Sequence, residues 1–103
     1  MVRYSGETIS RELMFERKFH VQGLQERILL HIFVPRPEHD AWICEYQLKV
    51  PGWEQPICVP IAGIDKLQSV TAVFRRVRSD LALIAERLGR QITFLDEPRL
   101  DLI

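Results

Sequence analysis

The chain of 103 residues lacks most of the features that would reveal a chemistry or a location. It has two cysteines, Cys44 and Cys58, which are too far apart to form a CxxC zinc pair. No apolar run approaches the roughly 20 residues that a membrane-spanning helix needs. The start of the chain has no apolar segment behind its first basic residue, unlike a signal peptide. The sequence therefore predicts one small cytoplasmic domain.

A net charge is also missing, because the 14 basic and 14 acidic residues cancel. A neutral domain has no long-range attraction for nucleic acid or for anionic lipid. The sequence contains no Gly-rich phosphate loop, no Gly-x-Ser-x-Gly elbow and no paired-carboxylate motif. We therefore expect no nucleic-acid or membrane partner, no cofactor, no metal ion and no catalytic residue.

The strongest positive signal is a helix over residues 64–88. Its apolar residues recur at spacings of three and four, which places them on one face of a helix. Asp65 suits the N-cap, since its carboxylate can accept hydrogen bonds from amides of the first turn, and Gly89 suits the C-cap. The predicted stripe is Leu67, Val70, Phe74, Val77, Leu81, Ile84 and Leu88.

Strand-like alternation of apolar and polar residues surrounds this helix. The predicted strands are 11–21, 27–34, 41–50 and 57–61 before the helix and 91–95 after it, with a loop at 35–40. The 27–34 segment is apolar on both faces and should be central, whereas Pro56 and Pro60 favour an edge for 57–61. Residues 1–10 and 99–103 are expected to be flexible.

The order β-β-β-β-α-β predicts a single α+β domain. It combines an antiparallel sheet of four to five strands with one long helix packed on one face. The other face would then carry large apolar side chains, which water rarely meets on central strands unless a partner covers them. We predict a partner surface there, formed by Leu29, His31, Phe33 and Ile43.

Several residues invite a chemical interpretation. Cys44 alternates with core residues, which favours a buried, reduced thiol over a nucleophile. His20 and His31 share one face, but no convergent set of three or four ligands accompanies them. Asp65 and Gln68 form a candidate polar site at the helix N-terminus, where an anion could bind, although capping already explains Asp65. The helix arginines are interpreted as a solvated face.

The segment Gly63-Ile64-Asp65-Lys66-Leu67-Gln68-Ser69-Val70 resembles the Gly-Val-Asp-Ser-Leu-Gln-Ala-Leu helix start of a family of small uncharacterised bacterial proteins. Trp42, Cys44 and the Ile-Thr-Phe-Leu run after the helix fit the same pattern, so the resemblance spans residues 12–98. It implies a bacterial origin and this order of elements. It implies no catalytic residue.

Together these patterns predict a small bacterial binding or accessory protein that acts by protein–protein contact. An immunity-type protein, which neutralises a toxin, is one concrete form, by analogy. A structural homodimer formed through the open sheet face is one alternative. A small-molecule binder or enzyme with a pocket between helix and sheet, near Gln68 or Tyr46, is the other.

Overall fold

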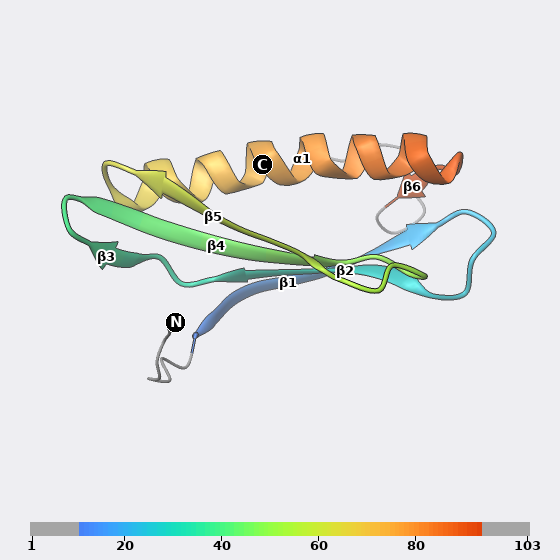
Figure 1. Ribbon diagram of the computed structural model, residues 1–103, viewed down its shortest axis with the longest axis horizontal. Coiled ribbons are helices and arrows are strands. Elements are labelled where there is room, and N and C mark those ends of the chain that lie inside the picture. The colour runs from blue at the N-terminus through green and yellow to red at the C-terminus, as the bar shows by residue number, and fades with distance from the viewer. Residues whose placement is uncertain (1–10, 94–103) are drawn as a thin grey trace.

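A computed structural model describes residues 11–93 of the chain as a sheet with one helix laid across it (Figure 1). The α+β class is confirmed. In chain order the elements are β1 (Leu13–Val21), β2 (Arg27–Phe33), β3 (Arg36–Glu38), β4 (Ala41–Lys49), β5 (Ile57–Gly63), α1 (Lys66–Leu88) and β6 (Ile92–Thr93).

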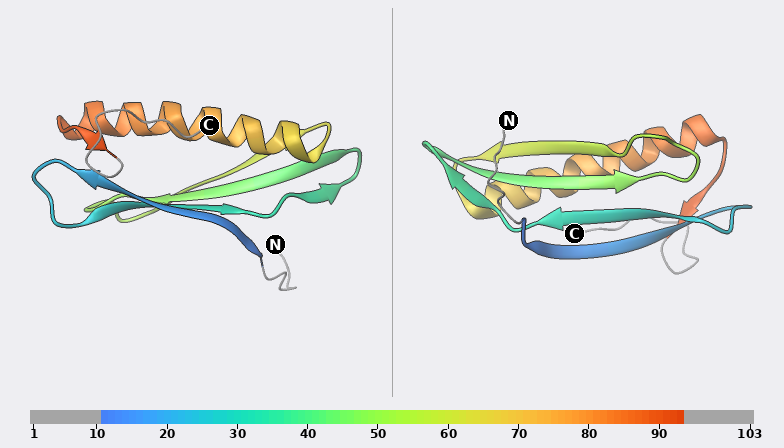
Figure 2. Two further views of the ribbon diagram at one scale, coloured as in Figure 1. Left: turned by 180° about the vertical axis from the view of Figure 1, so that it is seen from behind. Right: turned by 60° about the horizontal axis from the view of Figure 1, so that its bottom comes forward.

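All strand pairs are antiparallel, and the sheet order is β3-β4-β2-β1-β6, with β5 also paired to β4. The prediction that residues 27–34 form a central strand is confirmed, because β2 lies between β1 and β4. In the described part of the chain, β5 pairs only with β4 and is an edge. Two further views show that α1 and the sheet form two layers (Figure 2).

Two strand predictions need correction. The predicted loop at 35–40 contains the short strand β3, in which Pro37 pairs with Trp42. The register of β1 against β2 also shifts between Leu13 and Phe15, so Leu13 pairs with Phe33 and Phe15 with Ile32. Because paired residues share a face, the bulge moves Leu13 to the side away from the helix, against the simple alternation.

The last predicted strand, 91–95, is described only in part, as β6. The remainder of that segment lies outside the described residues, as do the ends 1–10 and 99–103 for which flexibility is expected.

The core lies between α1 and the sheet. From the sheet, Leu30, Ile32 and Tyr46 are fully buried as expected, whereas Trp42 and Phe15 are partly exposed. The buried helix residues are Ser69, Val73, Val77, Leu81 and Ile84. The predicted stripe is therefore wrong at Leu67, which is 75% exposed, and it overstates Phe74, which is half-buried.

Both helix ends follow the sequence signals. Asp65 adopts the extended N-cap conformation, and Gly89 closes the helix with a left-handed φ of 64°, which glycine adopts without steric cost. A Cβ atom on Gly63 would lie 2.5 Å from the backbone nitrogen of Ser69. The absence of that atom lets β5 pass directly against the first turn of α1.

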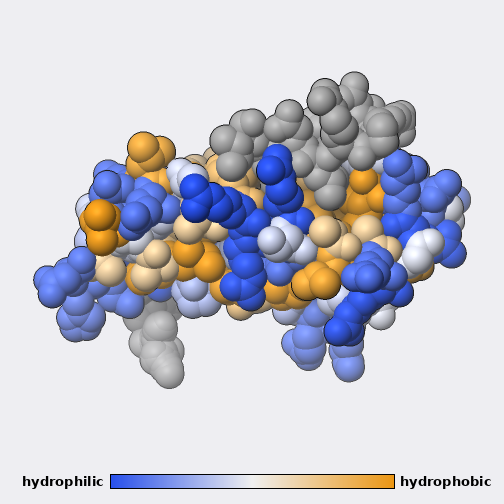
Figure 3. Space-filling view, turned by 90° about the horizontal axis from the view of Figure 1, so that it is seen from above, coloured by the Kyte–Doolittle hydropathy of each residue, from blue (hydrophilic) through white to orange (hydrophobic). Residues whose placement is uncertain are grey.

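Viewed from the helix side, hydrophilic and hydrophobic residues alternate over the surface (Figure 3). The apolar side chains most exposed on α1 and the residue before its cap are Ile64, Leu67 and Leu83. Single exposed apolar residues are normal on a soluble domain.

Candidate interaction surface

The face of the sheet away from α1, called here the outer face, carries all four residues predicted for a partner surface. Leu29, His31 and Phe33 follow one another along this side of β2, and Ile43 lies on β4. Each of the four is partly buried, while the intervening residues Ile28, Leu30 and Ile32 are fully buried in the core. The alternation of β2 therefore gives the outer face a row of half-exposed, largely apolar side chains.

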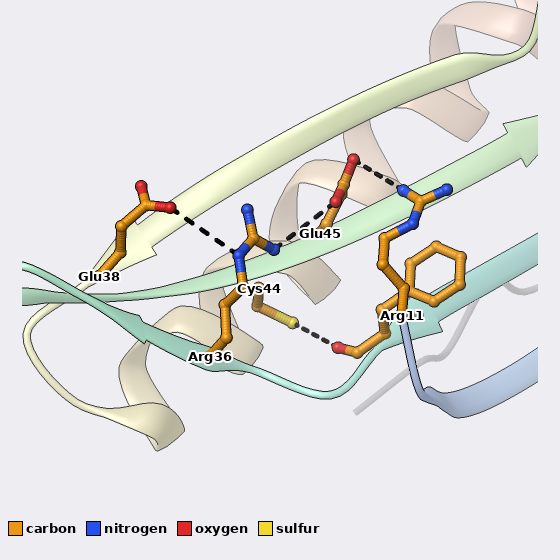
Figure 4. A network of polar contacts seen from close by, with 6 residues as sticks. Arg11, Arg36, Glu38, Cys44 and Glu45 are labelled. Atoms are coloured by element: carbon orange, nitrogen blue, oxygen red, sulfur yellow. Dashed lines mark hydrogen bonds and ion pairs between the residues drawn. The ribbon is translucent and has the colours of Figure 1, made fainter. Parts of the chain in front are cut away.

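A chain of ion pairs crosses the outer face beside this row (Figure 4). Glu45 accepts from Arg11 at 2.9 Å and lies 3.7 Å from Arg36, whose Nε is 3.9 Å from Glu38. The Glu45 side chain is only 19% exposed, so its charge is partly removed from water and needs these partners. Four side chains from β3, β4 and the segment before β1 thus hold one another in place.

Arg11 also covers part of the apolar row. Its guanidinium carbon lies 4.4 Å from the centre of the Phe33 ring, a cation–π arrangement. The ring of His31 lies 6.3 Å from that of Phe33 and nearly edge-on to it, and Nε2 of His31 lies 2.8 Å from a carboxylate oxygen of Glu16. The outer face is therefore an ordered mixture of aromatic, aliphatic and charged groups.

The second predicted site, Asp65 with Gln68, is a reciprocal cap. Asp65 Oδ1 accepts a hydrogen bond from the backbone amide of Gln68 at 2.7 Å, and Gln68 Oε1 accepts one from the amide of Ile64 at 2.6 Å. This arrangement resembles a capping box, which a Gln three residues after an N-cap Asp signals in the sequence, except that Gln68 accepts from the residue before the N-cap. Both side chains are used by the helix start, and anion binding there stays a prediction.

One polar cluster lies between the helix and the sheet at the border of the core, where the sequence patterns gave no expectation. The hydroxyl of Tyr46 on β4 donates a hydrogen bond to Asp80 on α1, and Asp80 also lies 3.4 Å from Nε of Arg76. Arg76 and Asp80 are four residues apart on α1, a spacing at which helical side chains are neighbours. Burial is the largest cause that raises the pKa of Tyr46 above its ordinary value, and the hydrogen bond to Asp80 is the next. The hydroxyl therefore keeps its proton, and its hydrogen bond joins the helix to the sheet.

The two cysteines lie in different settings. Cys44 is buried, and its thiol donates to the carbonyl of Phe33 at 3.4 Å. Burial raises the pKa of Cys44 to about 11, which suits a core residue and not a nucleophile. Cys58 is exposed and free. Across residues 11–93, no three His, Cys, Asp or Glu side chains converge on a metal position.

α1 itself has too few consecutive apolar residues to cross a bilayer. The model of one protein family, described as Domain of unknown function (DUF6968), matches residues 15–102. The chain belongs to this family. The match runs from β1 through β6, and it confirms the resemblance to a domain of unknown function. No curated protein and no solved structure matches this DUF6968 member.

Proposed function

We propose that this DUF6968 domain is a binding protein that contacts another protein through the outer face of its sheet. One observation carries the proposal: Leu29, Phe33 and Ile43 stay partly exposed along one sheet face, and Arg11, Arg36 and Glu45 beside Phe33 and Ile43 are already paired with one another. A half-exposed apolar centre with a polar surround is the usual anatomy of a protein interface. Aromatic and Arg side chains, here Phe33 and Arg11, are the types that most often dominate binding energy.

We place this contact in the bacterial cytoplasm, where an accessory or immunity-type protein would meet its partner. The internal pairing of Arg11, Glu45 and Arg36 supports a preformed surface, since a partner need not pay to order those side chains. The alternative of a pocket near Gln68 or Tyr46 gains no support, because both side chains are engaged within the fold.

Site-specific photo-crosslinking in the producing cells tests the proposal. A photoreactive residue at Gln47, beside His31 on the outer face, should give a discrete adduct with another protein. The same residue at Ala82, on the exposed side of α1, is the matched control and should give none. An adduct of twice the 12.1 kDa chain mass would indicate the homodimer instead.

A second experiment shortens the apolar side chains of the outer face. Phe33→Ala with Ile43→Ala should remove the Gln47 adduct while circular dichroism shows a folded domain. If that pair of changes unfolds the chain, Ile43→Ser alone serves the same purpose. Adducts of equal yield from Gln47 and Ala82 positions, unchanged by truncation, would contradict an outer-face contact.

A further inference from the structure

Three basic residues gather at one end of the outer face. Lys18 on β1 pairs with Leu29 on β2, and Leu29 pairs with Lys49 on β4. Neighbouring strands lie about 4.8 Å apart, so the two lysines flank Leu29 with backbones about 10 Å from each other. Arg27 stands two residues before Leu29 on the same side of β2. These three cations, named here the basic end, thus surround one half-buried apolar side chain.

The basic end borders a hollow in the surface. An open depression of about 450 Å³ is lined by Lys18, Gln25, Glu26, Arg27 and Leu29. Its lining has two cations, one acid, one amide and one apolar side chain. A concave site with a few polar groups around an apolar floor is typical of places where a ligand side chain inserts.

Charge is distributed unevenly along the outer face. Elsewhere on this face the acids have partners, since Glu45 contacts two arginines and Glu16 forms a hydrogen bond with His31. At the basic end, all three cations are exposed, and none forms an ion pair with another residue in the range 11–93. Unpaired positive charge therefore concentrates beside the hollow, although the whole chain is neutral.

We propose that the basic end binds an acidic segment of the partner protein. Carboxylates of that segment meet Lys18, Arg27 and Lys49, and an apolar side chain between them contacts Leu29 in the hollow. Complementary charge of this kind directs the encounter and fixes the orientation of the partner. The inference rests on the proposed function and adds the chemistry of the partner to it.

A protein segment fits this end better than a nucleic acid does. Three phosphate contacts give weak binding without base stacking, and the hollow has no aromatic side chain on which a base could stack. Glu26 in the lining also repels a continuous phosphate backbone, whereas a peptide can place an amide opposite it.

The test uses a synthetic peptide in which Glu and Leu alternate, titrated into the ¹⁵N-labelled full chain. We expect the amide signals of Lys18, Arg27, Leu29 and Lys49 to shift, and the affinity to fall as salt rises. Lys18→Glu combined with Lys49→Glu should weaken binding about tenfold or more, since it reverses two of the three charges. Arg75→Glu, a single charge reversal on the exposed side of α1, should leave binding unchanged.

Four results would overturn the inference: no shift with the acidic peptide, equal shifts with a peptide of alternating Lys and Leu, equal loss of binding in Arg75→Glu, or stronger shifts with a single-stranded DNA oligonucleotide of the same charge. If the charge-reversed variant unfolds, Lys49→Gln, which removes one of the three positive charges, is compared with the wild type instead. An outer-face adduct from Gln47 without any response to the acidic peptide would leave the proposed function standing and remove this inference alone.

Discussion

The hydroxyl of Tyr46, on β4, donates a hydrogen bond to the carboxylate of Asp80 on α1. Asp80 has only 13% of its side chain exposed, so the bond joins two largely buried polar groups across the two layers of the fold. The arginine that also contacts Asp80 is half-exposed. The tyrosine is therefore the partner that water cannot easily replace.

A double-mutant cycle measures this bond. Tyr46→Phe should lower the free energy of unfolding by about 1–2 kcal/mol, and Asp80→Ala by about 1–3 kcal/mol, because each leaves a buried group without its partner. The double variant should lose less than the sum of the two, by at least about 0.5 kcal/mol. Urea titrations give the three values, and strictly additive losses would show that the two residues act independently.

Alkaline pH should destabilise the fold. Burial raises the pKa of Cys44 to about 11 from 9.0, and burial together with Asp80 raises the pKa of Tyr46. A raised pKa means that the folded state holds the proton more tightly, so these contributions are complete below about pH 9 and decline as pH rises above it. Each group adds a slope of at most about 1.4 kcal/mol per pH unit.

Unfolding titrations at several pH values between 8 and 11 should show this slope. Tyr46→Phe and Cys44→Ala should each make it shallower, even though both lower stability at neutral pH. A wild-type stability that stays flat over this interval would contradict the assignment of both protons to the folded core.

The two cysteines should differ in reactivity. Iodoacetamide at pH 8 should alkylate exposed Cys58 in the folded protein, while Cys44, buried and with a raised pKa, should react only after unfolding. Mass spectrometry should therefore find one added group on native protein and none on Cys58→Ser. Alkylation of both sites at equal rates would mean that β4 opens readily.

The helix cap should behave as a structural feature. Asp65→Ala should cost about 1 kcal/mol, because the amide of Gln68 loses its acceptor. Gln68→Ala should cost a comparable amount through the amide of Ile64. A phosphate titration followed by NMR should leave residues 65–68 unshifted; saturable shifts there would favour an anion site.

The rings of Phe15 and Phe74 join β1 to α1, with centroids 5.6 Å apart in an edge-to-face geometry. Phe74→Ala should cost about 2–4 kcal/mol, somewhat below the range for a fully buried aromatic, since the side chain is half-buried. Leu67→Ala, on the exposed first turn of the same helix, is the matched control. A similar loss for both would mean that the helix face is assigned wrongly.

The order of elements follows from the sequence, because hydrophobic period and turn residues are local properties. Local patterns mispredict the residues whose burial depends on tertiary contacts. A stripe begun at Leu67 fits the spacing, but the close approach of Gly63 turns Ser69 toward the sheet instead. Ser69 tolerates burial because its hydroxyl donates to the carbonyl of Lys66 at 2.8 Å.

The outer face was predictable only in outline. Alternation along β2 places Leu29, His31 and Phe33 on one side, as the structure shows. The ion pairs of Glu45 join residues that are 34 and 9 positions away in sequence, and the pair of Lys18 and Lys49 around Leu29 depends on strand register. No short-range pattern encodes either arrangement, because both require the sheet order.

Pro60 lies in the middle of edge strand β5, opposite Glu45. Its nitrogen carries no hydrogen and so faces away from β4. On that open side, the nearest backbone donors are those of Cys58 and Ala62, about 13 Å apart. A strand from another molecule would find no backbone hydrogen-bond donor at the centre of this edge. The position of one ring thus disfavours the pairing of this edge with a strand of another molecule.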